Sequence, residues 1–167
     1  GVRIVPEVSI GKEVVFENGS SEKYDLLITI PPHSSPKVVQ NSELGNEQGW
    51  IPVDAKTLET KHKGVYAVGD VVSIKLPSGK PLPKSASFAL GQAEVVASNI
   101  SSQIIGTEAK NWDGVGECYL ETGENEAAYG TGNFFAMPSP IMSLQAANEN
   151  FYILKELWRE YWTRRLL

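Results

Sequence analysis

The stretch from Gly64 to Asp70, GVYAVGD, constrains the fold of this chain more than any other. Its apolar part, Val65–Val68, is bounded by glycines and predicts a buried strand of the parallel type. Gly69 ends the strand and Asp70 follows at its carboxyl end. A loop and a helical pattern come next. In open α/β sheets, ligands bind outside the carboxyl ends of strands and against helix amino termini, so the stretch predicts a ligand site.

The helical pattern runs from Ala86 to Ile105, and Gly106 is placed to end it. Gln92 and Glu94 are interpreted as residues of its polar face. The apolar stripe is predicted to consist of Phe88, Val95, Val96, Ile100 and Ile104.

Shorter patterns predict strands on both sides of this unit. They lie at residues 14–16, 24–30, 50–54 and 118–121, and a last strand comprises residues 127–129 and 133–136. Residues 122–125 are predicted to turn between the strand at 118–121 and this last strand, and Met137–Pro140 to end the pair. Asp54 is interpreted as a carboxylate that begins a turn.

The GVYAVGD stretch resembles the second FAD-binding motif of the FAD-dependent pyridine nucleotide-disulfide oxidoreductases, and residues 60–70, TKHKGVYAVGD, fit that family's approach to it. Residues 81–84, PLPK, are similar to the sulfide:quinone oxidoreductase branch, together with Phe88-Ala89 and the run from Gln92 to Ile100. This narrower resemblance extends from Tyr24 to Phe135.

The resemblance implies an α/β fold, namely the carboxyl-terminal part of a flavoprotein with two dinucleotide-binding domains of the three-layer ββα type. Residues 1–36 are then expected to be a β-meander, the tail of the NAD(P)-type domain. Residues 37–108 are expected to be the carboxyl-terminal half of the FAD-binding domain. Residues 109–167 are expected to form a small α+β domain that ends in an amphipathic helix.

The chain has no Gly-x-Gly-x-x-Gly that follows a strand and opens a helix, whereas a complete enzyme of this family needs one. We therefore expect the chain to be the carboxyl-terminal part of a longer flavoprotein, with the missing amino-terminal FAD-binding half as its partner. The isolated chain is expected to be colourless and inactive.

Three residues of the motif are expected to bind the cofactor. Like charges repel, so Asp70 cannot bind a pyrophosphate directly, but it can accept hydrogen bonds from hydroxyl groups. The resemblance implies that it does so for the ribityl chain of FAD. Gly69 leaves room for close backbone approach, and the N–H of Val71 is available to a phosphate.

Lys84 and Ser85 stand where the long helix begins. The family places its Pro-Lys near the isoalloxazine ring, and reduction of a flavin puts negative charge on that ring. A helix amino terminus carries partial positive charge, and a lysine beside it adds to the field. The pair is therefore expected to favour the anionic reduced flavin. The alternative is a solvated lysine before a helix.

Cys118 is the only cysteine, so the sequence predicts neither an internal disulfide nor a multi-cysteine metal site. Two interpretations stay open. The resemblance implies a redox-active residue near the flavin, paired with a cysteine in the missing part. The other interpretation is a buried structural cysteine in a strand.

The last helical pattern, residues 151–167, combines aromatic and apolar residues with arginines. It fits contact with a membrane surface, a second copy of the chain or its own domain. No apolar run reaches the roughly 18 residues of a membrane-spanning helix. A net charge of −5 argues against a nucleic-acid partner. The expected location is the cytoplasm, or the periphery of the cytoplasmic membrane.

These observations predict an enzyme that passes two electrons from a donor, sulfide first, through FAD to a quinone-type acceptor. One alternative is a flavoprotein like the type II NADH:quinone dehydrogenases. The other is a non-enzymatic interaction module whose last helix is its working surface.

Overall fold

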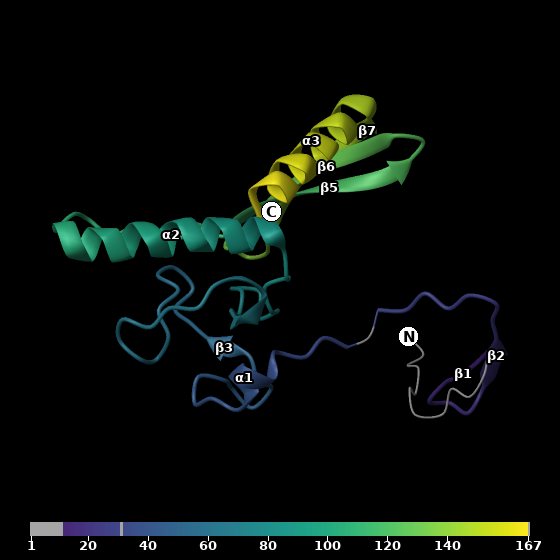
Figure 1. Ribbon diagram of the computed structural model, residues 1–167, viewed down its shortest axis with the longest axis horizontal. Helices are drawn as coiled ribbons and strands as arrows, with labels where there is room; N and C mark the ends of the chain where they lie inside the picture. Colours follow the sequence, from purple (N-terminus) through teal and green to yellow (C-terminus); the bar gives the residue numbers. More distant parts are fainter. Residues whose placement is uncertain (1–11, 31, 167) are drawn as a thin grey trace. The chain divides into compact units, whose positions relative to one another are not determined.

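The computed structural model describes residues 12–30 and 32–166 (Figure 1). The chain forms two compact units, Gly1–Ser34 and Ser35–Leu167, which are described separately. The domain boundaries expected after residues 36 and 108 stay predictions.

The first unit contains one described hairpin. Strand β1 (Glu13–Val15) pairs antiparallel with β2 (Ser21–Lys23), and Gly19 turns the chain between them at φ 82°. The strand expected at residues 14–16 is confirmed within one residue. The expected strand residues before 12 lie outside the described residues.

The strand expected at residues 24–30 is wrong. Leu26, Ile28 and Ile30 alternate as in a strand, but all three are exposed. No strand among the described residues pairs with this segment. Alternation alone cannot make a strand, because the backbone groups of a strand need a partner.

The second unit begins with short elements. Helix α1 (Lys37–Gln40) is a single turn, and strands β3 (Ile51–Pro52) and β4 (Val72–Ser73) pair in parallel. β3 confirms part of the strand expected at residues 50–54. Asp54 begins a turn as expected, because its carboxylate accepts the N–H groups of Lys56 and Thr57.

The buried parallel strand predicted at Val65–Val68 is wrong. Only Ala67 of this run is buried, and Tyr66 forms a single antiparallel bridge with Glu59. The segment folds back on residues 58–60, where the N–H of Ala67 donates to the carbonyl of Leu58 over 3.1 Å. Local pairing thus replaces the expected place in a sheet.

Helix α2 (Ala86–Ile105) has the predicted bounds, and Gly106 ends it at φ 73°. Its buried stripe differs from the predicted one. Ile100 and Ile104 are 44% and 79% exposed. The residues buried on this helix are Phe88, Gln92, Asn99 and Ser102. The assignment of Gln92 to the polar face is therefore wrong.

The polar residues of this stripe hold loops against α2. The side-chain amide of Asn99 donates to the carbonyl of Lys110 over 2.9 Å and accepts its N–H over 2.7 Å. Ser102 donates its hydroxyl to the carbonyls of Ser98 and Glu108. Buried polar groups are stable when they are hydrogen-bonded in this way. The polar residues of α2 therefore fix the segment around residues 108–110, which leads into the next sheet, against the helix.

That sheet has the order β5-β6-β7 and is antiparallel, formed by β5 (Val115–Gly123), β6 (Glu126–Asn133) and β7 (Ile141–Asn148). The expected turn is confirmed, and Glu124 and Asn125 both have positive φ as in a type I′ hairpin. The strand expected at 133–136 stops at Asn133. β7 was not predicted, because its side chains are mostly exposed and show no alternation.

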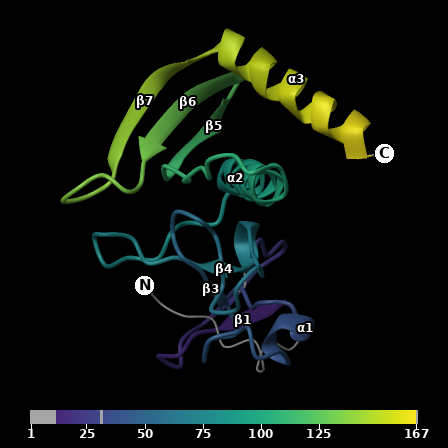
Figure 2. The same cartoon turned by 90° about the vertical axis from the view of Figure 1, so that its left-hand side faces the viewer.

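Helix α3 (Glu149–Leu166) packs on β6 and confirms the helix expected near the end of the chain. Within this unit α2 lies between the β3–β4 layer and the three-stranded sheet, and α3 crosses the sheet (Figure 2). Phe88 joins the layers, since its ring contacts the edges of Trp112 and Phe134 at 5.7 and 4.9 Å between centroids.

Gly116 gives the sharpest test of this packing. A Cβ at Gly116 would overlap the ring of Phe88, whereas a Cβ at Gly130 would meet Leu144 at an ordinary 3.5 Å. We expect Gly116→Ala to lower the free energy of unfolding by about 1–3 kcal/mol and Gly130→Ala to change it far less. Urea denaturation followed by tryptophan fluorescence measures both. Equal effects of the two variants would contradict the packing of α2 on β5.

Candidate functional site

Four of the predicted site residues lie around one small hollow. Gly69, Asp70, Lys84 and Ser85 line it, and its volume is about 10 Å³. That is room for about one water molecule or hydroxyl group. Asp70 and Lys84 therefore lie at the same hollow, and their role in binding a cofactor stays a prediction. Val71 does not line the hollow, and its side chain packs on the core.

Gly69–Val71 form a 3-10 turn, η2, whose position is set by Gln92. The N–H of Gly69 donates to the side-chain oxygen of Gln92 over 2.7 Å, and Gln92 is only 1% exposed. Gly69 has φ 78°, in the left-handed region that favours glycine. This role of Gln92 was not predicted from the sequence. The sequence feature that indicates it is the side-chain amide of Gln92, which lies one helical turn after Phe88 on the same face of α2.

Lys84 is not simply solvated. Its ammonium donates to the carbonyl of Val72 over 2.6 Å and lies 4.3 Å from the centroid of the Trp50 ring. Partial burial lowers the pKa of Lys84, while the neighbouring carboxylate of Asp70 raises it. The cation is therefore held close to the start of α2.

The amino terminus of α2 is not capped by a side chain. Ser85 takes the extended N-cap conformation, but its hydroxyl lies 3.1 Å from the hydroxyl of Ser87 and caps no backbone group. The first N–H groups of a helix have no partner within the helix. Together with Lys84 they form a positive site suited to an anionic or electron-rich group.

Cys118 lies on β5 opposite Gly130 and is exposed. Its interpretation as a buried structural cysteine is wrong, because β5 is the edge strand beside α2 and leaves residue 118 at the surface. Cys118 lines a second hollow of about 240 Å³ together with Lys84 and Ser85. The structure thus brings the cysteine next to the lysine and the helix start. Its redox role stays a prediction.

A larger groove of about 530 Å³ lies between the first turns of α2, strand β5 and helix α3. Ser85, Leu90 and Glu94 line it from α2. The other lining residues include Val115, Glu117, Cys118 and Tyr119 of β5, Thr131 of β6, and Lys155 and Trp158 of α3. Ser85, Glu117 and Cys118 also line the smaller hollow, so the two spaces adjoin at β5.

Glu117 is held at both its backbone and its side chain. Its N–H donates to the hydroxyl of Ser87 over 3.1 Å, and its carboxylate accepts the hydroxyl of Tyr129. The Tyr129 ring stacks on Phe151 at 5.5 Å. The hydrogen bond to Glu117 raises the pKa of Tyr129 to about 12.

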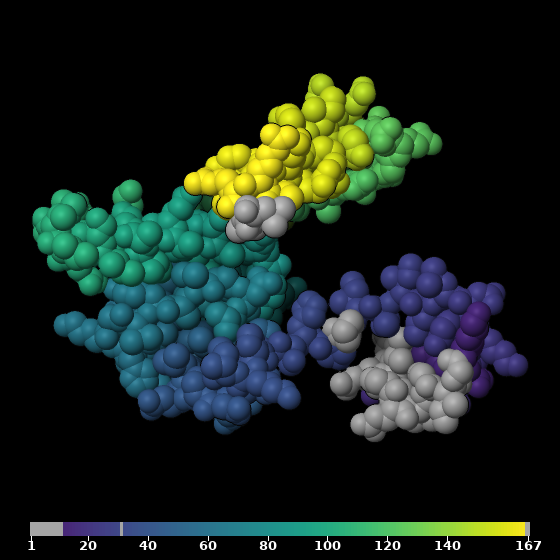
Figure 3. Space-filling view, viewed as in Figure 1, coloured from purple at the N-terminus to yellow at the C-terminus, as the bar shows by residue number. Residues whose placement is uncertain are grey.

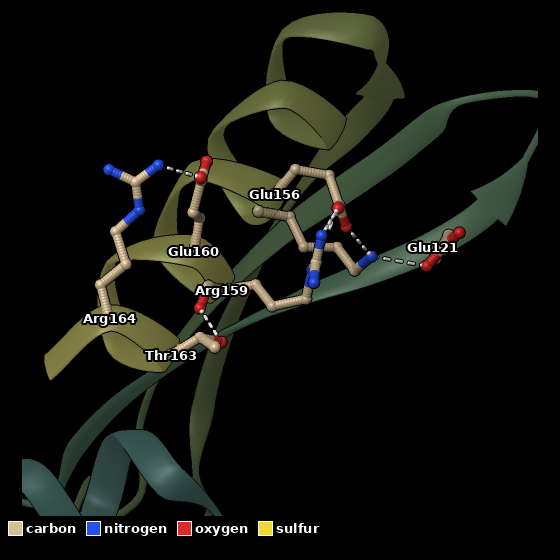
Figure 4. Close-up of polar contacts among 7 residues, drawn as sticks. Glu121, Glu156, Arg159, Glu160, Thr163 and Arg164 are labelled. Atoms are coloured by element: carbon tan, nitrogen blue, oxygen red, sulfur yellow. Dashed lines mark hydrogen bonds and ion pairs between the residues drawn. The ribbon is translucent and has the colours of Figure 1, made fainter. Parts of the chain in front are cut away.

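The basic residues of α3 are largely paired (Figure 4). Lys155 bridges Glu121 of β5 and Glu156 at 2.7 and 3.0 Å, and Arg159 also contacts Glu156. Arg164 contacts Glu160.

The apolar residues of α3 are less covered. Leu154, Leu157 and Trp158 are 47%, 57% and 42% exposed, and α3 lies at the surface of its unit (Figure 3). None of the helices in the described part of the chain has the length and hydropathy needed to cross a bilayer.

The described part of the chain has an α/β fold. A solved structure of the sulfide:quinone oxidoreductase from Aquifex aeolicus matches with a TM-score of 0.71 and 18% identity, covering 96% of this chain and 39% of that one. The match confirms the expected fold class.

Two curated proteins are similar in sequence to this chain. The chain is 26% identical over 136 residues to the mitochondrial sulfide:quinone oxidoreductase of Mus musculus, covering 79% of this chain and 29% of that protein. It is 32% identical over 111 residues to a coenzyme A disulfide reductase of Staphylococcus aureus, covering 62% and 24%. No protein-family model matches.

These similarities agree with the resemblance seen in the sequence, and the chain spans less than a third of the length of these two curated relatives.

The contact between Glu117 and Tyr129 can be tested by pH titration of phenolate absorbance. We expect one tyrosine to ionise near pH 12, above the ordinary value of 10, and Glu117→Gln to bring that pKa down because a neutral amide does not oppose the phenolate. Since the folded-state pKa is raised, its contribution to stability is complete below pH 10 and is lost as pH rises toward 12.

Tyr129→Phe assigns the transition, and Glu126→Gln on β6 is the control. An unchanged titration in Glu117→Gln would show that the two side chains do not interact.

Proposed function

We propose that this chain is the carboxyl-terminal part of an FAD-dependent enzyme that passes two electrons from sulfide, through FAD, to a quinone. One observation carries the proposal. Lys84 and Ser85, at the start of α2, line two hollows. Asp70 lines one of these hollows and Cys118 lines the other. A missing amino-terminal half would supply the rest of the FAD site and a second cysteine.

The residues present fit a flavin dinucleotide. Asp70 offers an exposed carboxylate to polyol hydroxyls, and Gly69 keeps the backbone beside it free of a side chain. Lys84 and the free N–H groups of α2 offer positive charge to a ring that becomes anionic. When bound, FAD would accept and release electrons in pairs. The chain's own part is to orient the cofactor and to stabilise its reduced form.

The groove beside β5 supports a quinone-type acceptor. Its lining is largely apolar, with Leu90, Val115 and Trp158 around a space of about 530 Å³. That volume is typical of a small-molecule site. Trp158 of α3 lines the same groove, and Leu154 and Leu157 of this helix are also exposed. We therefore propose that α3 meets a membrane surface or a second copy of the chain. The enzyme would then be cytoplasmic, or peripheral on the cytoplasmic membrane.

Sulfide is favoured as donor by the exposed thiol of Cys118. If Cys118 formed a disulfide with the second cysteine, attack by hydrosulfide would break the S–S bond, form a persulfide on one cysteine and release the other as a thiolate, whose electron pair a bound flavin would accept. The second candidate is a flavoprotein like the type II NADH:quinone dehydrogenases, which would take its electrons from a nicotinamide. The two candidates differ in the donor that reduces the flavin.

The donor can be tested with the natural flavoprotein that contains this chain. We expect sulfide to bleach the flavin absorption under anaerobic conditions and NADH not to do so. Cys118→Ser should abolish bleaching by sulfide, because the thiolate that exchanges sulfur is gone, while chemical reduction by dithionite continues. Bleaching by NADH but not by sulfide would support the nicotinamide-dependent candidate and overturn ours.

The role of Lys84 can be tested by the midpoint potential of the bound flavin. Lys84→Gln removes a cation beside the reduced ring, so we expect the two-electron potential to fall by about 30 mV, equivalent to about 1.4 kcal/mol. Lys80→Gln changes an exposed lysine of the same loop and should leave the potential unchanged. A potential that is the same in both variants would remove Lys84 from the flavin site.

A further inference from the structure

Glu117 is an ionisable side chain that lines both larger hollows of the candidate site. In the 240 Å³ hollow it lies with Lys84 and Cys118, and in the 530 Å³ groove it lies with Lys155 and Trp158. Neither the sequence motif nor the family resemblance singled it out. Its place on β5 puts a carboxyl group between the expected flavin side and the expected acceptor side.

The carboxyl group is also oriented. The Tyr129 ring lies between Tyr119 and Phe151, at 5.1 and 5.5 Å between centroids, which limits the direction of its hydroxyl. That hydroxyl donates to Oε2 of Glu117. Among the described residues no hydrogen-bond donor is paired with Oε1, so one carboxylate oxygen stays available to a ligand.

We propose that Glu117, aligned by the hydroxyl of Tyr129, is the proton donor to a quinone that is reduced in the groove. The inference rests on the proposed function and adds to it the residue that completes acceptor reduction. Glu117 is the catalytic residue of this step, and Tyr129 is a positioning residue.

The chemistry balances as follows. Reduction of a quinone to a quinol takes two electrons, which a bound flavin would supply, and two protons. The carboxylic acid of Glu117 breaks its O–H bond and transfers one proton to a quinone oxygen. Its carboxylate is exposed and regains a proton from water. The second proton comes from solvent through the open side of the groove.

The charges around Glu117 come from several elements. Glu94 of α2 and Lys155 of α3 line the same groove, and Lys84 lines the adjoining hollow. Cys118 and Tyr119 are its neighbours on β5, and Tyr129 faces it from β6. Lys155 is already paired with Glu121 and Glu156. Glu117 is distinguished from Glu94 by its hydrogen bond to Tyr129 and its position in both hollows.

The test compares two acceptors in the natural flavoprotein reduced by its own donor. A soluble ubiquinone analogue needs protons, whereas ferricyanide takes single electrons and no protons. We expect Glu117→Gln to lower quinone turnover by about 100-fold, the usual scale of general acid catalysis, and to leave ferricyanide turnover unchanged. Tyr129→Phe should lower quinone turnover less, by up to about 10-fold. Glu126→Gln, an exposed carboxylate of β6, is the control and should match the wild type.

Two further readouts separate proton transfer from a structural effect. The pH profile of quinone turnover should lose one ionisation in Glu117→Gln, and Glu117→Asp should recover part of the rate. Quinone turnover in Glu117→Gln within twofold of wild type, or an equal fall with ferricyanide, would overturn the inference. Failure of the wild type itself to reduce any quinone would overturn the proposed function as well, so the two failures are distinguishable.

Discussion

The candidate site depends on one hydrogen bond, from the N–H of Gly69 to the side chain of Gln92. It joins the turn that carries Asp70 to the helix that begins after Lys84. Because Gln92 is buried, losing either partner would leave a polar group without solvent, at a cost of about 1–3 kcal/mol. The acid and the cation thus keep a fixed separation although thirteen residues lie between them in the sequence.

The same principle organises the rest of α2. A helix that buried only apolar residues would pack on a sheet, but it would offer no hydrogen-bond partners to the backbone of a loop. Asn99 forms two hydrogen bonds with the backbone of Lys110, much as a neighbouring strand would. Ser102 forms one hydrogen bond with the backbone carbonyl of Glu108. The polar stripe therefore positions the chain that leads from α2 toward Trp112 and the start of β5.

The sequence predicted well those features that depend on neighbouring residues, and it predicted poorly those that depend on partners distant in the chain. The bounds of α2 were predictable to the residue because helical spacing and the glycine at 106 are local signals. The strand at Val65–Val68 was not, since a run of apolar residues does not reveal which backbone it will pair with. Ile100 and Ile104 fit the periodicity as well as Asn99 and Ser102 do, and only the loops packed on the helix decide between the two faces. For the candidate site, the motif alone singles out Gly69, Asp70, Lys84 and Ser85, which line one hollow, whereas the positions of Gln92 and Glu117 depend on partners distant in the chain.

The position of β5 explains why one strand can serve two spaces. Gly116 lets the ring of Phe88 lie directly against the strand, so the backbone of residues 116–118 comes close to the start of α2. Side chains of a strand alternate between faces. Val115 and Tyr119 accordingly line only the larger groove, while Gly130 and Met142 from the neighbouring strands line only the smaller hollow. Ser85, Glu117 and Cys118 line both spaces, so the groove and the hollow meet at β5 beside the start of α2.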